Sequence, residues 1–409
     1  MSGTLTGTPS RSFETTYPWI SFRLDLSRLD YHLWVDLGAI QSKVEHVANA
    51  LLPPDIAKKL RTLYLAKGVH GTTAIEGNSL TEDQVHDRIA NKTRLPESQE
   101  YLGQAIDNVA KACTAIWRQV LSEKMVLTSD RIRAFNRMVL EGLPLAEHVR
   151  PGEFRKCSVV VANYNGPHWE EVPFLVERLC RFLDVEFVCP DRQLVTGFAV
   201  LKAIVAHLYI AWIHPFGDGN GRTARLLEFQ ILLSGGVPTI AAHLLSNFYN
   251  QTRDKYYTEL AAASRSPEGM FSFLRYALQG FRDQLDEQIR HIREFQWAVV
   301  WRDCVYERFR GHSGPVVHRR RLFALELPRV CSVEASKLRR LTPEIAELYA
   351  GRTGKTLTRD INELEKMNLI VREGKIVCVN GALLAQFLPG RKVDHDSQNI
   401  QTPTPSDGQ

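Results

Sequence analysis

The chain has 409 residues, of which 44% are hydrophobic and 24% are charged. This is the composition of an ordinary globular protein, and the length allows two or three domains with ample core. The seven cysteines show no CxxC pair and no metal-ligand spacing, which argues against a disulfide framework and favours a reduced, cytoplasmic protein. The N-terminus lacks the basic and apolar segments of a secretory signal. A net charge of +5 is compatible with nucleotide or nucleic-acid partners but indicates neither.

The two ends of the chain differ in composition from its middle. Residues 1–15 are rich in Ser, Thr, Gly and Pro, residues 392–409 are similarly poor in apolar side chains, and we expect both segments to be disordered. The middle is predicted to form an N-terminal helical region, a second helical core, a linker and a C-terminal domain, at residues 16–125, 126–295, 296–324 and 325–391.

Helical periodicity dominates the first two regions, so we expect a mainly α fold. The predicted helices cover residues 56–75, 101–120, 129–141, 173–183, 194–212, 222–233, 247–264 and 268–295. Gly77 can adopt the left-handed conformation that ends the first of them. Thr81 and Gln84 have the spacing of a capping box, which predicts the start of another helix directly afterwards.

The segment 194–213 is apolar and about long enough to cross a membrane. Lys202 and His207 lie in its middle, where both would be costly in lipid, and a charged, glycine-rich loop follows it. We therefore predict a buried core helix in which these two residues pack or pair, and no membrane partner.

Residues 152–169 break the helical period. Ser158–Val161 is rich in β-branched residues, and Asn163–Pro167 has the composition of a turn. These patterns predict a short β-hairpin.

The C-terminal domain has a different pattern. Residues 334–340, 343–349 and 357–367 predict three short helices, and residues 369–379 predict two strands about a Glu-Gly turn. This order resembles a winged helix-turn-helix domain. Its basic residues include Lys355 and Arg359, whereas neighbouring glutamates dilute the charge. DNA, a docked protein and a second copy of this chain in a homodimer all remain partners to consider.

The segment from His214 to Arg225 carries the strongest chemical signal. It follows the apolar segment, is rich in glycine and leads into a helix, and helix N-termini bind phosphate. It offers a base in His214, a hard metal ligand in Asp218, and two arginines that share a helix face, Arg222 and Arg225. The alternative, a solvated surface turn, does not explain why these residue types occur together.

This segment resembles the signature of the Fic-domain family, HPFxxGNGRxxR, and fills each of its fixed positions. The resemblance implies a helical Fic core that moves AMP from ATP to a Ser, Thr or Tyr hydroxyl of a target protein. In that resemblance His214 is the base and Asp218 holds Mg²⁺. The phosphates would be bound by Gly219, Asn220, Gly221, Arg222 and Arg225. Doc-type relatives, which transfer phosphate, carry Lys in place of the glycine that is Gly221 here.

Thr72–Asn78 resembles the inhibitory motif of many Fic proteins, (S/T)xxxE(G/N). The resemblance implies that Glu76 lies beside Arg225 and occupies the space of the γ-phosphate, which would make the enzyme autoinhibited. The alternative is an ordinary helix end capped by Gly77. Removal of AMP, with Glu76 orienting a water, is a further reading of the same residues, and so is a DNA-binding regulator whose Fic core senses nucleotide.

The predicted hairpin resembles the flap that covers the site in this family. Its edge at Val159, Val160 and Val161 would pair with an extended target segment. Tyr257 belongs to a segment that resembles the family's adenine contact. Ser264 stands where some relatives carry Asn, which leaves the preference for ATP open.

Overall fold

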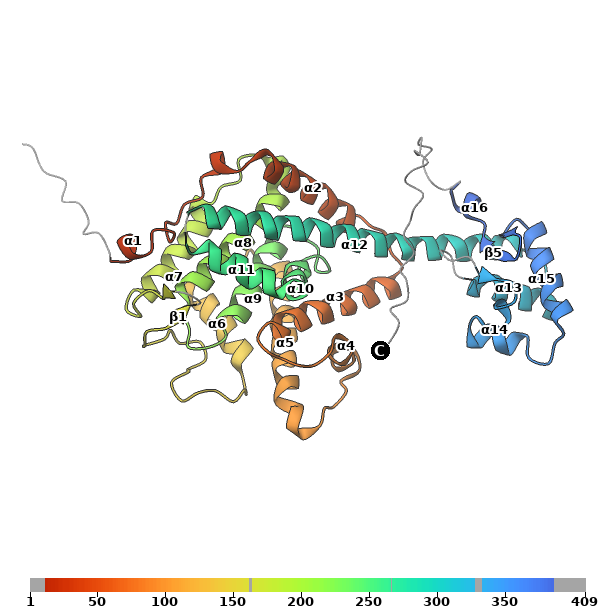
Figure 1. Ribbon diagram of the computed structural model, residues 1–409, viewed down its shortest axis with the longest axis horizontal. Helices are drawn as coiled ribbons and strands as arrows, with labels where there is room; N and C mark the ends of the chain where they lie inside the picture. The colour runs from red at the N-terminus through yellow and green to blue at the C-terminus, as the bar shows by residue number, and fades with distance from the viewer. Residues whose placement is uncertain (1–11, 162–163, 266, 328–332, 386–409) are drawn as a thin grey trace, which may run out of the picture. The chain divides into compact units, whose positions relative to one another are not determined.

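The computed structural model describes residues 12–161, 164–265, 267–327 and 333–385. The chain divides into two compact units, Met1–Ile292 and Arg293–Gln409 (Figure 1). The predicted boundary near residue 125 does not separate units, because helices on either side of it pack together within the first unit.

The first unit is helical. Its α-helices are α1 (Ser12–Thr16), α2 (Tyr31–Ala48), α3 (Pro54–Ala74), α4 (Glu82–Asn91), α5 (Glu100–Ser122), α6 (Ser129–Leu140), α7 (Val172–Arg181), α8 (Val195–Ile213), α9 (Asn220–Ser234), α10 (Leu244–Gln251), α11 (Arg253–Ala263) and the first part of α12 (Pro267–Arg308). The mainly α fold predicted from the sequence is therefore confirmed. The helix expected at residues 247–264 is instead two helices, which meet at Thr252.

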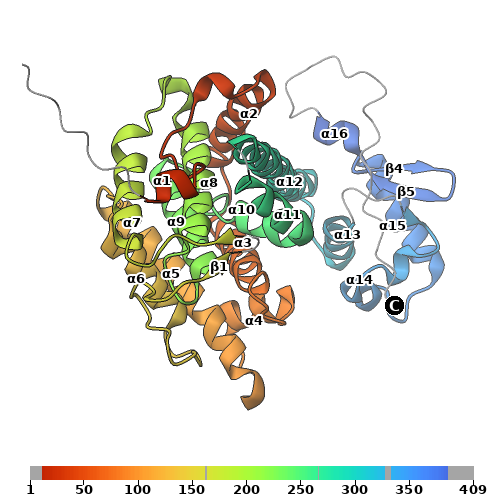
Figure 2. The ribbon, with the colours of Figure 1, turned by 60° about the vertical axis from the view of Figure 1, so that its left-hand side comes forward.

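Helix α8 forms the centre of this unit and packs along α9, with α2 and α7 also against it (Figures 1 and 2). It is the one helix in the described part of the chain that is long and apolar enough to cross a membrane, and 72% of its apolar window is buried. Nζ of Lys202 lies 3.4 Å from Oδ1 of Asp184, and Nδ1 of His207 lies 3.0 Å from Oε2 of Glu228. These positions agree with a core helix that carries two paired polar residues.

Helices α3 and α10 approach each other closely and lie side by side in both ribbon views (Figures 1 and 2). A Cβ atom on Gly68 would lie 2.4 Å from Nδ1 of His243, and one on Gly71 would lie 2.5 Å from the carbonyl oxygen of Ser246. Glycine at these two positions lets α3 pack directly against the side chain of His243 and the backbone of Ser246, at the start of α10.

The chain after α3 follows the predicted helix signals. Gly77 has a φ of 93° and ends the helical path. Thr81 and Gln84 exchange the two hydrogen bonds of a capping box at the start of α4. Local sequence thus determines where α3 ends and α4 begins.

Two predictions at the borders of the first unit were wrong. Residues 12–15, expected to be disordered, belong to α1, and Phe13 is only 4% exposed; residues 1–11 lie outside the described residues. Residues 296–324, expected to be a linker, continue α12 to Arg308 and begin another helix, because apolar side chains such as Trp301 are buried in the second unit.

The second unit contains α13 (Pro315–Glu326), β3 (Val333–Glu334), a 3-10 turn (Leu338–Arg340), α14 (Pro343–Leu348), α15 (Gly354–Lys366), β4 (Ile370–Glu373), β5 (Ile376–Val379) and α16 (Gly381–Ala385). The prediction of a helix at residues 334–340 was wrong, because its first residue, Glu334, pairs with Ile376 in a strand. The three strands are antiparallel in the order β3-β5-β4.

Asp360 of α15 lies at the centre of the second unit. Its carboxylate is 1% exposed and accepts bonds from Arg319, at 2.7 and 3.0 Å, and from Arg320 at 2.8 Å. The hydroxyl of Tyr349 donates to it at 2.9 Å. This network joins α15 to α13 and to the end of α14. The tail predicted to be disordered, residues 392–409, lies outside the described residues.

Candidate functional site

The segment from His214 to Arg225 joins α8 to α9 through a tight loop, as the sequence predicts. His214 ends α8 in the left-handed conformation, with a φ of 47°, and its N–H donates to the carbonyl of Ile210 at 2.9 Å. Gly219 stands directly before α9 with a φ of 77°, a conformation that favours glycine. The first N–H groups of α9 therefore lie at this loop, where a helix can hold an anion.

Asn220 holds the loop in shape with its side chain. Its Oδ1 accepts from the N–H of Phe216 at 2.9 Å, and its Nδ2 donates to the carbonyl of the same residue at 2.9 Å. Phe216 is 1% exposed and anchors the loop in the core. Because the side-chain amide of Asn220 is bonded to the loop on both sides, its backbone N–H is the group suited to a phosphate.

The imidazole of His214 is arranged to accept a proton at Nε2. Its Nδ1 lies 3.4 Å from the carbonyl oxygen of Ala211, so the hydrogen of the neutral ring belongs on Nδ1 and the lone pair on Nε2. Burial lowers the pKa of His214, and this effect outweighs the nearby carboxylates of Glu76 and Asp218, which raise it. The ring is therefore neutral at neutral pH.

Arg225 is a buried cation that pairs with the carboxylate of Glu76. Its side chain is 1% exposed, and its Nη2 lies 2.5 Å from Oε1 of Glu76, whose side chain is 30% exposed. The same Nη2 donates to the carbonyl of Thr72 at 3.0 Å. Neither Nε nor Nη1 of Arg225 has a hydrogen-bond partner among the residues that the structure describes. Since buried donors are normally hydrogen-bonded, these two are suited to an anionic ligand.

Glu76 is an ionised carboxylate at this site. Burial raises its pKa, but the charge and hydrogen bond of Arg225 and the charge of Arg222 outweigh burial, so the pKa is lowered. The ion pair with Arg225 is therefore fully formed at neutral pH.

Gly221 lies directly against this carboxylate. A Cβ atom there would be 2.2 Å from Oε1 of Glu76 and 3.2 Å from Nη1 of Arg225. The Glu76 carboxylate thus occupies the position that a side chain at Gly221 would need.

Asp218 and Arg222 form an ion pair across the loop. Oδ1 of Asp218 lies 3.0 Å from Nη2 of Arg222, and the Asp218 side chain is 45% exposed. No cluster of three or more His, Cys, Asp or Glu side chains that could hold a metal occurs in the described part of the chain. Mg²⁺ commonly uses one carboxylate and completes its shell with water and substrate phosphates, and Asp218 fits that donor set.

The predicted adenine contact lies beside the end of α3. The hydroxyl of Tyr257 donates to the carbonyl of Ile75 at 2.9 Å, and Nη2 of Arg253 donates to the same carbonyl at 2.9 Å. Tyr257 is 45% exposed, so its ring is also accessible to a ligand. Ser264 is buried and donates to the carbonyl of Ala261 at 3.1 Å. Arg253 and Tyr257, both on α11, therefore hold the carbonyl of Ile75, the residue that precedes Glu76.

The predicted hairpin forms, with β1 (Val160–Val161) antiparallel to β2 (Tyr164–Asn165). The N–H of Gly166 donates to the carbonyl of Val159 at 2.8 Å and extends the pairing by one bond. The side chain of Val160 is 73% exposed. Asn163, the first residue of the predicted turn, lies outside the described residues.

Arg155, which no sequence pattern indicated, ties the hairpin to the loop. Its side chain is buried, and its Nε donates to the carbonyl of His214 at 2.8 Å. Its Nη1 donates to the carbonyl of Cys157 at 2.7 Å and its Nη2 to that of Pro167 at 2.6 Å, at the two ends of the hairpin. One guanidinium thus fixes both ends of the hairpin next to His214.

Asn136 of α6 was also missed. It is fully buried, and its Nδ2 donates to the carbonyl of Asp218 at 2.9 Å while its Oδ1 accepts from the N–H of Gly152 at 2.9 Å. A lone Asn in an amphipathic helix gives no sequence signal of this kind. Its contacts join α6, the loop and the segment that leads to the hairpin.

A base, an anion-binding helix end and two arginines define the class of this site, which is suited to a phosphorylated ligand. Residues 126–232 match the model of the Fic/DOC family. The matched segment spans α6 through most of α9.

Curated relatives support the same assignment. The chain is 31% identical over 204 residues to the protein adenylyltransferase Fic of Drosophila ananassae, a match that covers 48% of this chain and 36% of that protein. It is 25% identical over 280 residues to the protein adenylyltransferase fic-1 of Caenorhabditis briggsae, which covers 67% of this chain and 50% of that protein. The chain thus spans between a third and half of the length of these relatives.

Among solved structures, a Fic family protein from Desulfovibrio desulfuricans G20 superposes with a TM-score of 0.54 at 18% identity. The superposition covers 90% of this chain and all of that one. At this identity the similarity bears on the fold alone, and it agrees with the mainly helical architecture described above.

Proposed function

We propose that the chain is a protein adenylyltransferase that moves AMP from ATP to a Ser, Thr or Tyr hydroxyl of a target protein and is autoinhibited by Glu76. The observation that carries this proposal is the buried guanidinium of Arg225. It has donors that suit a phosphate, and its one carboxylate partner is Glu76.

Each residue of the loop has a separate role in the proposed reaction. The target hydroxyl oxygen attacks the α-phosphorus and gives its proton to Nε2 of His214, while the bond from the α-phosphorus to the bridging oxygen breaks and pyrophosphate leaves. The N–H groups of Gly219, Asn220 and Gly221 hold phosphate oxygens. Positioning and charge stabilisation supply most of the rate enhancement. Mg²⁺ held by Asp218 would offset the charge of the phosphates.

Gly221 supports transfer of AMP rather than phosphate. The resemblance to Doc-type relatives links phosphate transfer to a lysine at this position, and a lysine would collide with the Glu76 carboxylate here. A glycine lets the phosphates lie against the backbone at the start of α9.

The proposed inhibition follows from competition for Arg225. A γ-phosphate and the Glu76 carboxylate both need its donors, and the two anions would repel each other if they shared them. With Glu76 in place, ATP loses that contact and binds in an orientation unfit for transfer.

The test uses the full chain and ATP labelled on either the α- or the γ-phosphate. Glu76→Gly should label itself or lysate proteins from the α-label and not from the γ-label, and adding His214→Ala should abolish that labelling. Glu76→Gln keeps the shape and removes the charge, so it should show partial release. Label transferred from the γ-phosphate, or none from either position, would count against adenylyl transfer.

The reverse reaction is the second candidate, and the ionised Glu76 near His214 favours it, since the pair could orient a water. A target bearing AMP distinguishes the two directions. Wild-type protein should release AMP and Glu76→Gly should not, if removal is the activity.

The second unit supports a further proposal, a winged helix. Its order of three helices and a β3-β5-β4 sheet fits that fold, and Lys355 and Arg359 are exposed on α15. Arg339 is less suited to DNA, because it donates to the carbonyls of Tyr349 and Arg352 at 3.0 and 2.7 Å. A gel shift with random DNA at low and high salt tests the DNA-binding regulator, and the absence of a shift at low salt excludes it.

A further inference from the structure

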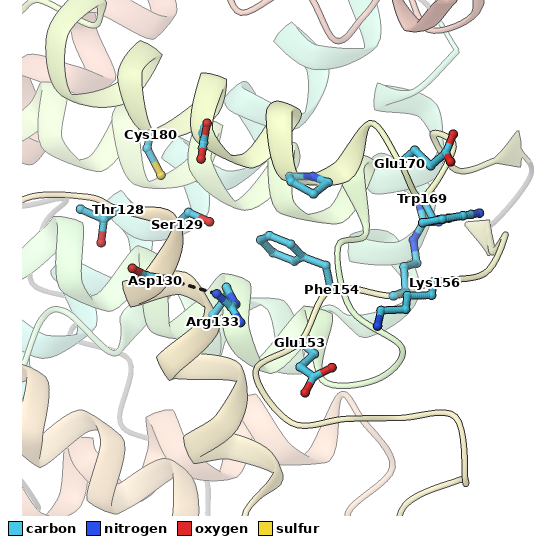
Figure 3. A pocket seen from close by; sticks show the side chains of 13 residues that line it. Thr128, Ser129, Asp130, Arg133, Glu153, Phe154, Lys156, Trp169, Glu170 and Cys180 are labelled. Atoms are coloured by element: carbon cyan, nitrogen blue, oxygen red, sulfur yellow. Dashed lines mark hydrogen bonds and ion pairs between the residues drawn. The ribbon is translucent and has the colours of Figure 1, made fainter.

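A cavity of about 900 Å³ lies beside the hairpin rather than at the phosphate loop. Its walls come from the start of α6, from α7 and from the two ends of the hairpin (Figure 3). At one end Lys156 and Trp169 flank it, and at the other Ser129 and Cys180 do. Neither His214 nor Arg225 lines it. The cavity is an open groove whose one end lies at the two ends of the hairpin. We call it the flap groove.

The floor of the flap groove is aromatic. Phe154 projects into its middle, and Trp169 stands at the flap end (Figure 3). The ring centroid of Phe154 lies 5.6 Å from that of Phe216, the core anchor of the phosphate loop. An apolar side chain seated on Phe154 would thus rest one ring away from the loop that carries His214.

The rim of the flap groove is acidic. The side chains of Asp130 and Glu170 are 91% and 66% exposed, and Glu153 and Glu177 are exposed as well. The cations are fewer and mostly engaged. Arg133 pairs with Asp130 at 3.2 Å and donates to the carbonyl of Gly152 at 2.8 Å. Arg155 is buried and donates to carbonyls at both ends of the hairpin and to that of His214. Lys156 is the exposed exception.

We propose that the flap groove binds a basic, extended segment of the target protein, next to the segment that pairs with the flap. This inference rests on the proposed adenylyl transfer. The strands β1 and β2 have two residues each, too few to fix the register of a target by themselves. The groove adds an aromatic seat and four exposed carboxylates that continue from the flap ends, and it selects targets with an apolar side chain followed by Lys or Arg.

Binding of two synthetic peptides tests the proposal without nucleotide. Both peptides carry a fluorescent label, an acceptor Tyr and a Leu, and they differ only in having a run of lysines or a run of glutamates. In fluorescence anisotropy the lysine peptide should bind the full chain and the glutamate peptide should not. Glu177→Lys combined with Glu170→Lys should weaken the lysine peptide by roughly ten-fold and let the glutamate peptide bind.

Glu45→Lys is the matched control, because Glu45 is an exposed carboxylate on α2 that does not line the groove. It should leave both affinities unchanged. Equal binding of the two peptides, no binding of either, or an equal loss in the Glu45 variant would overturn the proposal.

The groove and the proposed function can fail separately. If Glu76→Gly transfers AMP to lysate proteins and the groove variants bind peptides like the wild type, adenylyl transfer stands and the groove does not. If the lysine peptide binds through Glu170 and Glu177 but no AMP is transferred from labelled ATP, the groove is a peptide site and adenylyl transfer fails.

Discussion

Arg225 and Glu76 form an unequal ion pair, because the guanidinium is 1% exposed and the carboxylate is 30% exposed. The carboxylate can be withdrawn into water, whereas the guanidinium remains buried and needs another anion. Breaking the pair is therefore unfavourable chiefly because it leaves the guanidinium of Arg225 buried without a counter-charge.

Glu76→Gly should lower the free energy of unfolding by about 3 kcal/mol, since it leaves a buried cation unpaired. ATP should restore much of that loss, because its phosphates supply the missing charge. Thermal unfolding with and without ATP measures both effects. The variant should gain more from ATP than the wild type does, and an equal gain would show that Glu76 and nucleotide do not compete.

A double-mutant cycle tests the contact between Gly221 and Glu76. Gly221→Ala should destabilise the wild type by about 2 kcal/mol, because its Cβ displaces the carboxylate from Arg225. In the Glu76→Gly background the same change should be neutral or stabilising, since alanine is the better helix former by about 1 kcal/mol. Equal effects in the two backgrounds, measured by urea unfolding, would refute the contact.

The pKa of His214 should lie below 6.5, because burial disfavours the charged ring. The neutral base is then present at neutral pH and is lost only as the pH falls through this lowered pKa. Glu76→Gly should lower the pKa further, since the carboxylate raises it. Titration of the histidine signals by NMR, with His214→Ala for assignment, checks both. A midpoint at or above 6.5 would contradict the burial argument.

Arg155→Met should loosen the hairpin, because methionine fills the space but replaces none of the bonds to Cys157, Pro167 and His214. Hydrogen exchange at residues 157–169 should speed up in the full chain, and transfer by the Glu76→Gly variant should fall by about ten-fold or more. Unchanged exchange in that segment would mean that Arg155 does not hold the flap.

Asp360→Asn should destabilise the second unit by about 3 kcal/mol, because it leaves the buried guanidinium of Arg319 without its carboxylate. Hydrogen exchange in α13 and α15 should increase in the full chain. Glu363→Gln, a change at a half-exposed neighbour on α15, is the control and should have little effect.

The parts of the site that the sequence predicted are those encoded locally. The loop from His214, the left-handed Gly77 and the capping box at Thr81 each depend on residues within a few positions of one another. The approach of Glu76 to Arg225 came from a family resemblance, because no local pattern joins residues so far apart in the chain.

The missed features all depend on distant partners. Arg155 binds carbonyls of three separate segments, which residue type alone does not reveal. Glu334 was expected to begin a helix, but it pairs with Ile376 in a strand. The first part of the expected linker, residues 296–308, belongs to α12, because Trp301 packs in a core formed mainly by residues that come later in the chain. In each case tertiary packing overrode the local pattern.

The glycines of α3 have a consequence for how the site can be activated. Gly68 and Gly71 bring α3 into close contact with His243 and Ser246, and this close packing disfavours a movement of α3 as a rigid rod. Release then needs only a local change, in the Glu76 side chain or in the turn that ends at the left-handed Gly77. Under the proposed inhibition, an activator needs to displace only the few residues at this helix end.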